Sequence, residues 1–219
     1  MGGQSGHKPA AELCNLKESN MSALKTKRSL GAHPLVSPAP SFLIGSYDAT
    51  GKPNVMAAAW AGICCSKPLS IAVAIRPERW SHDAILARKA FTVGHAPVSL
   101  MAEADFVGMA SGRDRDKFAE AKLTAVRAEK VDAPYADECP VVLECVLLKA
   151  VELGAHTLMI GEIVDVKADE DCLDPTGKFP DFSKVDALIY DPASQGYYRV
   201  GERVGKAFAA GEPLFSNKK

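Results

Sequence analysis

The segment 51–62, GKPNVMAAAWAG, places small residues around one large aromatic side chain. Four alanines and Gly62 lie close to Trp60 within it. Alanine and glycine form strands weakly, so their clustering costs local propensity and needs a reason. One explanation is that a flat ligand approaches exposed backbone groups at this point. The other is tight packing between secondary-structure elements.

Two further segments combine cations, hydroxyl groups and glycine. Residues 76–82, RPERWSH, end an expected strand with two arginines and start an expected helix at Ser81. Guanidinium groups are forked donors and a helix N-terminus has free N–H groups, so this segment suits a phosphate monoester. Residues 111–118, SGRDRDKF, repeat the mixture of groups. For this second segment the alternative is a solvated, charged helix start.

The elements that must position these residues are predicted from periodicity and turn signals. A turn signal at 48–53 between two apolar runs predicts a β-hairpin from residue 41, with Ser81 as the N-cap of a later helix. Further strands are expected at 69–77, 91–97, 140–154, 156–169, 187–191 and 196–201, and helices at 81–90, 99–110 and 114–123.

The order of these elements is several strands, a cluster of helices and then more strands. Because strands and crossover helices do not alternate, a doubly wound parallel sheet is disfavoured. The expected fold is mostly β with inserted helices, as an antiparallel barrel. Residues 1–20 are polar and without periodicity, so we expect an N-terminal extension at 1–20 and a single domain at 21–219.

The composition excludes several classes of protein. The 219 residues carry 26 basic and 27 acidic side chains, which leaves no basic excess for nucleic acid. No apolar run is long enough to cross a membrane and no signal-peptide core is present, so a cytoplasmic location is expected. The six cysteines include no Cys-x-x-Cys, and adjacent Cys64 and Cys65 are expected on opposite faces of a strand. Buried reduced thiols are therefore expected, with no metal site.

Several familiar catalytic motifs are missing from the sequence. The segment 201–207, GERVGKA, is one residue short of a P-loop and lacks its Ser or Thr. There is no Gly-x-Gly-x-x-Gly after a strand and no Gly-x-Ser-x-Gly elbow. A Rossmann dehydrogenase and an α/β-hydrolase are disfavoured, and a nicotinamide cofactor would dock without a Rossmann fold.

From about Ser29 to Phe208 the chain resembles the flavin reductase-like FMN-binding split-barrel proteins, in the flavoredoxin-like branch. The resemblance rests on the order and spacing of KPNVMAAAWAG, the Ser66-x-Pro68 turn, the strand ending at Arg76, FTVGHAP, ADFVGMASGRDRDKF, LECVL and GAHTLMIGEIV. It implies a split barrel that holds FMN at the interface of a homodimer. One departure is Gly94 in FTVGHAP, where the family often has asparagine.

The resemblance also implies roles for individual residues. The flavin edge would lie against the backbone of residues 57–60, and His156 would contact the nicotinamide or help protonate reduced flavin. A satisfied core or loop residue is the alternative for His156. The cofactor-binding residues expected from the resemblance are Asn54, Ala57, Ala58, Ala59, Trp60, Ser66, Arg76, Ser81, His95, Ser111 and Lys117, of which Arg76, Ser81 and Lys117 would bind the phosphate or ribityl chain.

Two functions fit this sequence. The first is an enzyme that transfers hydride from NADH or NADPH to flavin, supplying reduced flavin or passing electrons to an acceptor. The second is an electron-carrier module that a partner protein reduces and that has little nicotinamide activity of its own. The lack of a Rossmann motif is compatible with both.

Overall fold

The computed structural model describes residues 26–215. The chain divides by its contacts between Pro34 and Leu35, and every element below belongs to the second unit, which begins at Leu35. The expected boundary after residue 20 lies outside the described residues.

Strands dominate the described chain, which confirms the prediction of a mostly β fold. In chain order they are β1 (Ala39–Pro40), β2 (Phe42–Tyr47), β3 (Pro53–Ala58), β4 (Ala61–Ser66), β5 (Leu69–Ile75), β6 (Ala90–His95), β7 (Ala125–Arg127), β8 (Pro134–Ala136), β9 (Val141–Leu153), β10 (His156–Ala168), β11 (Leu188–Asp191) and β12 (Gly196–Arg199).

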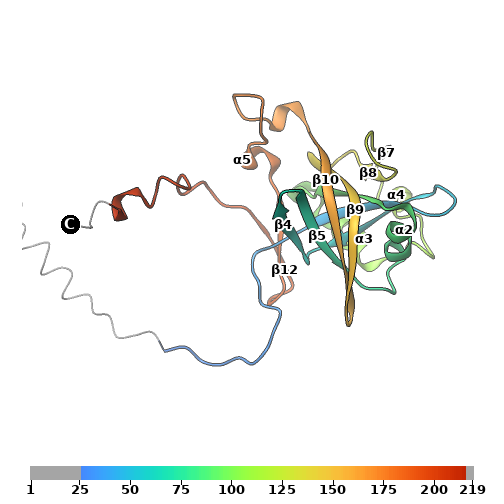
Figure 1. Ribbon diagram of the computed structural model, residues 1–219, viewed down its shortest axis with the longest axis horizontal. Helices are drawn as coiled ribbons and strands as arrows, with labels where there is room; N and C mark the ends of the chain where they lie inside the picture. The colour runs from blue at the N-terminus through green and yellow to red at the C-terminus, as the bar shows by residue number, and fades with distance from the viewer. Residues whose placement is uncertain (1–25, 216–219) are drawn as a thin grey trace, which may run out of the picture. The chain divides into compact units, whose positions relative to one another are not determined.

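These strands form three antiparallel sheets. The largest has the order β3-β2-β6-β9-β10-β5-β4, and the smaller ones are β1-β11-β12 and β7-β8. The long β9–β10 hairpin lies beside β5 and β4 (Figure 1). The predicted hairpin from residue 41 is β2 and β3, whose turn is held by the Asp48 carboxylate accepting from the Thr50 and Lys52 N–H groups, each at 2.8 Å. Antiparallel pairing throughout is as the sequence predicted.

The helices are inserted between the strands, mostly in the middle of the chain. They are α2 (Trp80–Arg88), η1 (Val98–Leu100), α3 (Met101–Met109), α4 (Lys117–Glu120), η2 (Glu170–Cys172), α5 (Phe182–Val185) and η3 (Glu212–Leu214).

Two predicted helix starts differ from the structure. Helix α2 has its N-cap at Arg79 without a side-chain bond, and Ser81 lies inside the helix with its hydroxyl turned to Asn54. The helix expected at 114–123 is reduced to one turn, α4, because Asp116 caps it and accepts from the Ala119 N–H. A local hydrogen bond therefore sets the start of α4 three residues later than the charge pattern indicated.

The buried side chains lie on both faces of the large sheet. Consecutive strand residues point to opposite faces, so Leu43 and Ile44 enter different cores. One core contains the fully buried Ile44, Phe91 and Met159. The other, which contains Val107, lies where α3 packs on β3. Helix α3 is thereby fixed over the small-residue segment.

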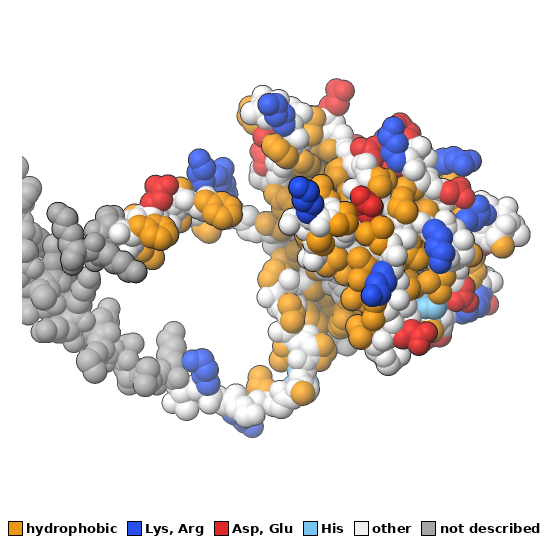
Figure 2. All heavy atoms as spheres, viewed as in Figure 1, with side chains coloured by type: hydrophobic (Ala, Val, Ile, Leu, Met, Phe, Trp, Pro, Cys, Tyr) orange, Lys and Arg blue, Asp and Glu red, His pale blue; other side chains and the backbone are white. Residues whose placement is uncertain are grey.

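Strand β4 is an edge strand of the large sheet and is unusually exposed. Ile63 is 69% exposed, and a register shift lies between Ile63 and Cys65. Both Cys64 and Cys65 are exposed, which contradicts the expectation of buried thiols at these positions. Exposed apolar side chains also occur on β9 and β10, including Leu148 and Val166, and Figure 2 shows hydrophobic side chains gathered over this region.

Within residues 26–215, none of the helices has the length and apolar character needed to cross a bilayer.

Candidate functional site

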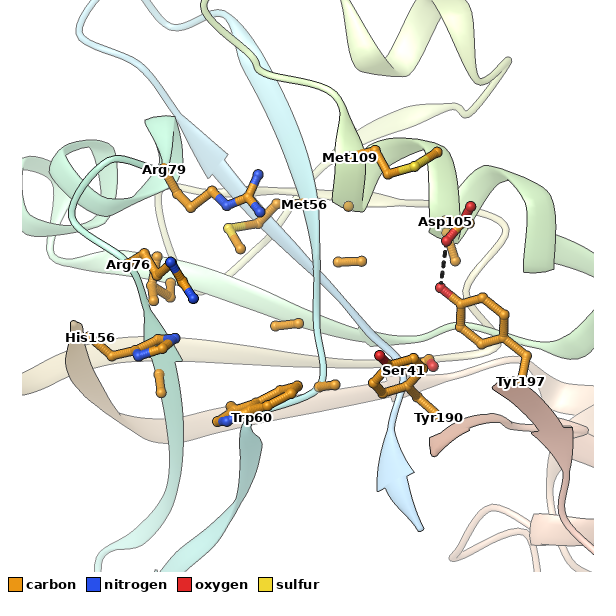
Figure 3. A pocket seen from close by; sticks show the side chains of 17 residues that line it. Ser41, Met56, Trp60, Arg76, Arg79, Asp105, Met109, His156, Tyr190 and Tyr197 are labelled. Carbon is orange, nitrogen blue, oxygen red and sulfur yellow. Dashed lines mark hydrogen bonds between the residues drawn. The ribbon is translucent and has the colours of Figure 1, made fainter. Parts of the chain in front are cut away.

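A cavity of about 380 Å³ opens where several elements of the barrel meet. Its walls come from the β3–β4 connection, the end of β5, the start of β10, helix α3, and strands β11 and β12. Figure 3 shows side chains from these elements pointing toward a common space. The size falls within the range of pockets that hold small molecules and cofactors. We call this the main pocket.

The small-residue segment forms one wall of the main pocket. Ala57, Ala58, Ala59 and Trp60 all line it, and Trp60 is 45% exposed. The Trp60 carbonyl accepts from the Ala74 N–H at 2.9 Å, which joins the β3–β4 connection to β5. A Cβ added to Gly108 of α3 would lie 3.2 Å from Ala57 Cβ. The structure therefore supports the packing explanation, and the same small residues line a pocket.

A second, smaller cavity of about 110 Å³ adjoins the main pocket. The two cavities share Met56, Arg79 and Gly108. The smaller one, which we call the lysine pocket, is also lined by Ser81, Ser111, Gly112 and Lys117. The structure thus brings together the two cation-containing segments that the sequence analysis singled out.

Lys117 is the most unusual group of the lysine pocket. Only 4% of the residue is exposed, and its ammonium donates to the backbone carbonyls of Val107 at 3.0 Å and Ala110 at 3.4 Å. No carboxylate within residues 26–215 forms a salt bridge with it. Burial, and after it the nearby Arg79 guanidinium, lower the Lys117 pKa to about 8. A buried cation with neutral partners favours binding of an anion.

Asn54 and Ser81 form a buried polar pair at the edge of the lysine pocket. The Asn54 side-chain amide donates to the Ser81 hydroxyl at 2.9 Å. The residues are 4% and 1% exposed. A Cβ on Gly112 would lie only 2.4 Å from Asn54 Oδ1, so this glycine leaves the space that the amide occupies. The pair joins β3 to α2 and fixes the Ser81 side chain.

The two arginines of residues 76–79 occupy different places. Arg79 lines both cavities, whereas Arg76 lines only the main pocket. The Arg79 N–H donates to the Arg76 carbonyl at 3.0 Å, so a tight turn separates the side chains. Arg76 forms an exposed ion pair with Glu78 at 3.5 Å. The sequence analysis included both arginines in a segment suited to phosphate, but it assigned a cofactor-binding role to Arg76 alone.

His156 begins β10 and lines the main pocket beside Arg76 (Figure 3). The next residue, Thr157, is buried and bonds through its hydroxyl to His82 Nε2 at 2.9 Å. His156 pairs with Leu153 across the β9–β10 turn. The start of β10 is therefore anchored to α2, and the imidazole of His156 is left facing the cavity.

Three expected cofactor-binding residues line neither cavity of the described chain. One is Asn54, which contacts the lysine pocket through its bond to Ser81. The other two are Ser66 and His95, and Ser66 ends the exposed edge strand β4. The His95 ring packs edge-on to Phe42 and Phe182, with ring centroids 4.9 and 6.0 Å apart. Burial lowers the His95 pKa to about 4, so this imidazole is neutral at physiological pH. The structure does not bring either residue to the other expected residues.

Several residues of the main pocket were not anticipated from the sequence. Among them are Asp105 on α3, Tyr190 on β11 and Tyr197 on β12. The Tyr197 hydroxyl donates to Asp105 Oδ1 at 3.0 Å, as the dashed line in Figure 3 marks. Because 92 positions separate these two residues, no local pattern could have paired them.

Comparisons with known proteins agree with this architecture. A family model described as flavin reductase like domain matches residues 36–193. The flavoredoxin of Desulfovibrio vulgaris (Miyazaki F) is 49% identical, with a TM-score of 0.81 over 85% of this chain and 100% of that one. A putative flavin reductase with a split barrel domain from Shewanella frigidimarina is 23% identical, with a TM-score of 0.71 over 79% and 87% of the two chains. The second likeness shows the fold alone, and it confirms the predicted split barrel.

A curated relative shows a more distant match. The ferric-chelate reductase (NAD(P)H) of Archaeoglobus fulgidus is 30% identical over 107 residues, which cover 48% of this chain and 62% of that protein. The chain spans less than two thirds of the length of several curated relatives that it matches. The family model covers most of the chain and the flavoredoxin is matched over its whole length. The chain therefore belongs to the flavin reductase like family of oxidoreductases, in its flavoredoxin-like branch.

Proposed function

We propose that the chain binds FMN, with the phosphate in the lysine pocket and the flavin ring along the Ala57–Trp60 wall of the main pocket. The observation that carries this proposal is the buried Lys117 ammonium, whose partners within residues 26–215 are two backbone carbonyls. A phosphate dianion would compensate that charge. Charge-assisted bonds of this kind are about twice as strong as neutral ones.

The residues present fit the groups of FMN. The lysine pocket has two cations, Lys117 and Arg79, and the hydroxyl groups of Ser81 and Ser111 for phosphate oxygens. The main pocket is lined by Ala57, Ala58, Ala59 and Trp60, whose small alanine side chains leave room for the polar edge of the ring. The two cavities adjoin at Arg79, as a ligand with a phosphate at one end requires.

A titration with three flavins tests the phosphate assignment. Losing a charge-assisted contact costs about 1.5–3 kcal/mol, or roughly 10- to 150-fold in affinity. We therefore expect FMN to bind at least tenfold more tightly than riboflavin, and more tightly than FAD. Arg79→Ala should remove most of the preference over riboflavin, while Arg76→Ala should change it less, because Arg76 lies outside the lysine pocket. Equal affinities of the wild type for FMN and riboflavin would refute the assignment.

The reaction that we propose is the reduction of flavin by NADH or NADPH. FMN supplies the hydride and electron chemistry when it is bound, and the protein orients it and controls access to it. The A. fulgidus relative is named a ferric-chelate reductase (NAD(P)H), and this name supports a nicotinamide donor. We propose that His156 acts on protons at the ring, because an imidazole can both donate and accept a proton and this one lines the main pocket.

The second candidate function is electron transfer to or from a partner protein, with little nicotinamide activity. It is favoured by the 49% identity to a flavoredoxin. Steady-state oxidation of NADH and NADPH, with FMN, FAD or ferric chelates as acceptors, separates the two functions. Turnover that depends on added nicotinamide supports the reductase, and its absence in FMN-loaded protein supports the carrier.

We also propose that the protein is a homodimer, formed through the exposed apolar surface of β4, β9 and β10. The edge strand β4 and exposed side chains such as Ile63, Leu148 and Val166 support this arrangement. Exposed apolar patches of this kind occur at protein interfaces. A stable obligate dimer would bury more than ~2,000 Å² in total.

A further inference from the structure

The first turn of α2 connects two strands that carry the candidate site. Ser81, in the lysine pocket, accepts from the Asn54 amide of β3 at 2.9 Å. The next residue, His82, bonds through Nε2 to the Thr157 hydroxyl of β10, also at 2.9 Å. Thr157 directly follows His156, which lines the main pocket. One helical turn therefore fixes the lysine pocket and the start of β10 relative to each other.

The His82 ring has a hydrogen-bond partner at each nitrogen. Its Nδ1 lies 2.8 Å from Asp83 Oδ1, and its side chain is 10% exposed whereas that of Asp83 is 79% exposed. An ionised carboxylate only accepts hydrogen bonds, so the proton of the neutral ring is on Nδ1 and Nε2 is left as an acceptor. The Thr157 hydroxyl then donates to Nε2. Asp83 thus sets the tautomer that binds Thr157.

The same order of carboxylate, imidazole and hydroxyl occurs in enzymes that use a nucleophilic serine. A nucleophile must be reached by its substrate, but Thr157 is only 4% exposed and lines neither the main pocket nor the lysine pocket. Its hydroxyl is therefore an anchor for the start of β10 and not a reacting group.

The direction of the His156 side chain depends on this anchor. In the described part of the chain, the imidazole makes no hydrogen bond or ion pair of its own. Its backbone pairs with Leu153 across the turn, and the register with β5 begins one residue later, at Thr157 opposite Ile75. Consecutive strand residues point to opposite faces, so a Thr157 side chain held by α2 directs His156 to the other face, beside Arg76 (Figure 3).

We propose that His82 is a positioning residue for flavin reduction, because its bond to Thr157 fixes the direction of the His156 imidazole. This inference rests on the proposed function, in which His156 acts on protons at the flavin ring. His82 lines neither cavity, so it acts through β10 and contacts no ligand. A misplacement of about 1 Å can cost roughly 100-fold in rate, so an anchor of this kind is sufficient to control His156.

Two substitutions break the bond from its two ends. Thr157→Val keeps the shape of the side chain and removes the hydroxyl, and His82→Leu removes the ring nitrogens. In FMN-loaded protein, each should slow the reduction of bound flavin by NAD(P)H about 10- to 100-fold and leave the affinity for FMN within about twofold. Thr157→Ser keeps a hydroxyl and should restore most of the rate.

Thr92→Val is the matched control for lost packing and stability. Thr92 is also a buried strand threonine, its hydroxyl donates to the Pro134 carbonyl at 2.6 Å, and it lines neither cavity. This variant should reduce flavin at the wild-type rate. A double-mutant cycle then assigns the effect. In His156→Ala, adding Thr157→Val should cause no further decrease, because the side chain that the anchor directs is absent.

Nitrogen NMR of the histidine rings in flavin-free protein gives a readout that does not need turnover. Neutral His82 of the wild type should carry its proton on Nδ1. The His156 signals, identified by their loss in His156→Ala, should shift in Thr157→Val and His82→Leu. They should not shift in Thr92→Val.

The outcomes separate this inference from the proposed function. An unchanged reduction rate in Thr157→Val or His82→Leu, or a decrease that is equally large in the His156→Ala background, would overturn the positioning role. Unmoved His156 signals, or a neutral wild-type His82 with its proton on Nε2, would do the same. If one of the two variants does not fold, the other decides. If the wild type binds no FMN or is not reduced by NAD(P)H, the proposed function fails, and the His156 signals still test the anchor.

Discussion

Binding of FMN should depend on pH through Lys117. Its pKa is lowered from 10.5 to about 8, chiefly by burial, so the ammonium loses its proton as the pH rises from 7 to 9. The FMN phosphate remains a dianion over this range, because its second pKa is about 6. If the affinity for FMN changes with pH while the affinity for riboflavin does not, the group that titrates therefore belongs to the protein.

The size of the effect follows from the protonated fraction of Lys117. With a pKa of about 8, roughly nine in ten ammonium groups are charged at pH 7 and one in ten at pH 9. The affinity for FMN should fall about tenfold between these values. Riboflavin, which lacks the phosphate, should bind equally at both. Isothermal titration of wild type at pH 7 and pH 9 with both flavins measures this directly.

The variant Lys117→Met removes the titrating group and keeps most of the side-chain volume. It should bind FMN about 10- to 150-fold more weakly at pH 7, with no change between pH 7 and pH 9. Lys122→Met is the matched control, since Lys122 is exposed and outside both cavities. If the affinity of Lys117→Met for FMN still falls tenfold between pH 7 and pH 9, another group titrates and the Lys117 ammonium is not the cause of the pH dependence.

The same pKa shift predicts how the stability of flavin-free protein varies with pH. The unfolded chain keeps Lys117 protonated up to about pH 10.4, whereas the folded chain releases that proton near pH 8. The unfolded state thus binds more protons between these values, and the free energy of unfolding should rise with pH by up to about 3 kcal/mol. Denaturant titrations at pH 7.5 and pH 10 should show this rise in wild type relative to Lys117→Met.

Three further changes test the remaining parts of the site. His156→Ala should retain FMN and slow the reduction of bound flavin by NAD(P)H about 10- to 100-fold, a barrier change of roughly 1.4–2.7 kcal/mol. An unchanged rate in stopped-flow measurements would show that His156 has only a structural role. Ile63→Asp should convert a homodimer to a monomer of 23.3 kDa in light scattering, whereas a wild-type monomer at micromolar concentration would refute the dimer. Gly112→Ala should weaken FMN about tenfold, because its Cβ would lie 2.4 Å from Asn54 Oδ1 and displace the Asn54–Ser81 pair; calorimetry showing normal affinity would contradict this.

Local patterns predicted the longer strands and the helices α2, α3 and α4, but not the short strands β1, β7 and β8 or the short helices after β10. Alternating apolar residues and turn signals are local, so the β2–β3 hairpin and the run of helices before β9 followed from the sequence. The start of α2 did not, because the Ser81 hydroxyl bonds to Asn54, 27 positions away, instead of capping the helix. A tertiary partner overrode the local preference at that position.

Some residues of the candidate site could likewise be predicted from local composition, and others could not. Residues 54–60, 76–81 and 111–117 were found because each segment has an unusual composition by itself. Asp105, Tyr190 and Tyr197 were missed because each is ordinary in its own segment and becomes part of the cavity only when β11 and β12 cross α3. Both arginines of residues 76–79 fit the phosphate pattern, and Arg79 received no role because only the turn between them decides which one faces the lysine pocket.

Lys117 begins α4, but its ammonium lies at the C-terminal end of α3, and this position has a consequence for how a cofactor associates. The carbonyls of Val107 and Ala110, at the C-terminal end of this helix, hold the ammonium in place through bonds that the chain itself supplies. The negative end of the helix dipole acts as a counter-charge there. Ordering a long side chain on binding costs about 0.5–1.5 kcal/mol. The Lys117 side chain is already ordered in the folded protein, so binding does not include this cost. Capture of a phosphate is therefore limited by diffusion and desolvation, not by rearrangement of its lysine.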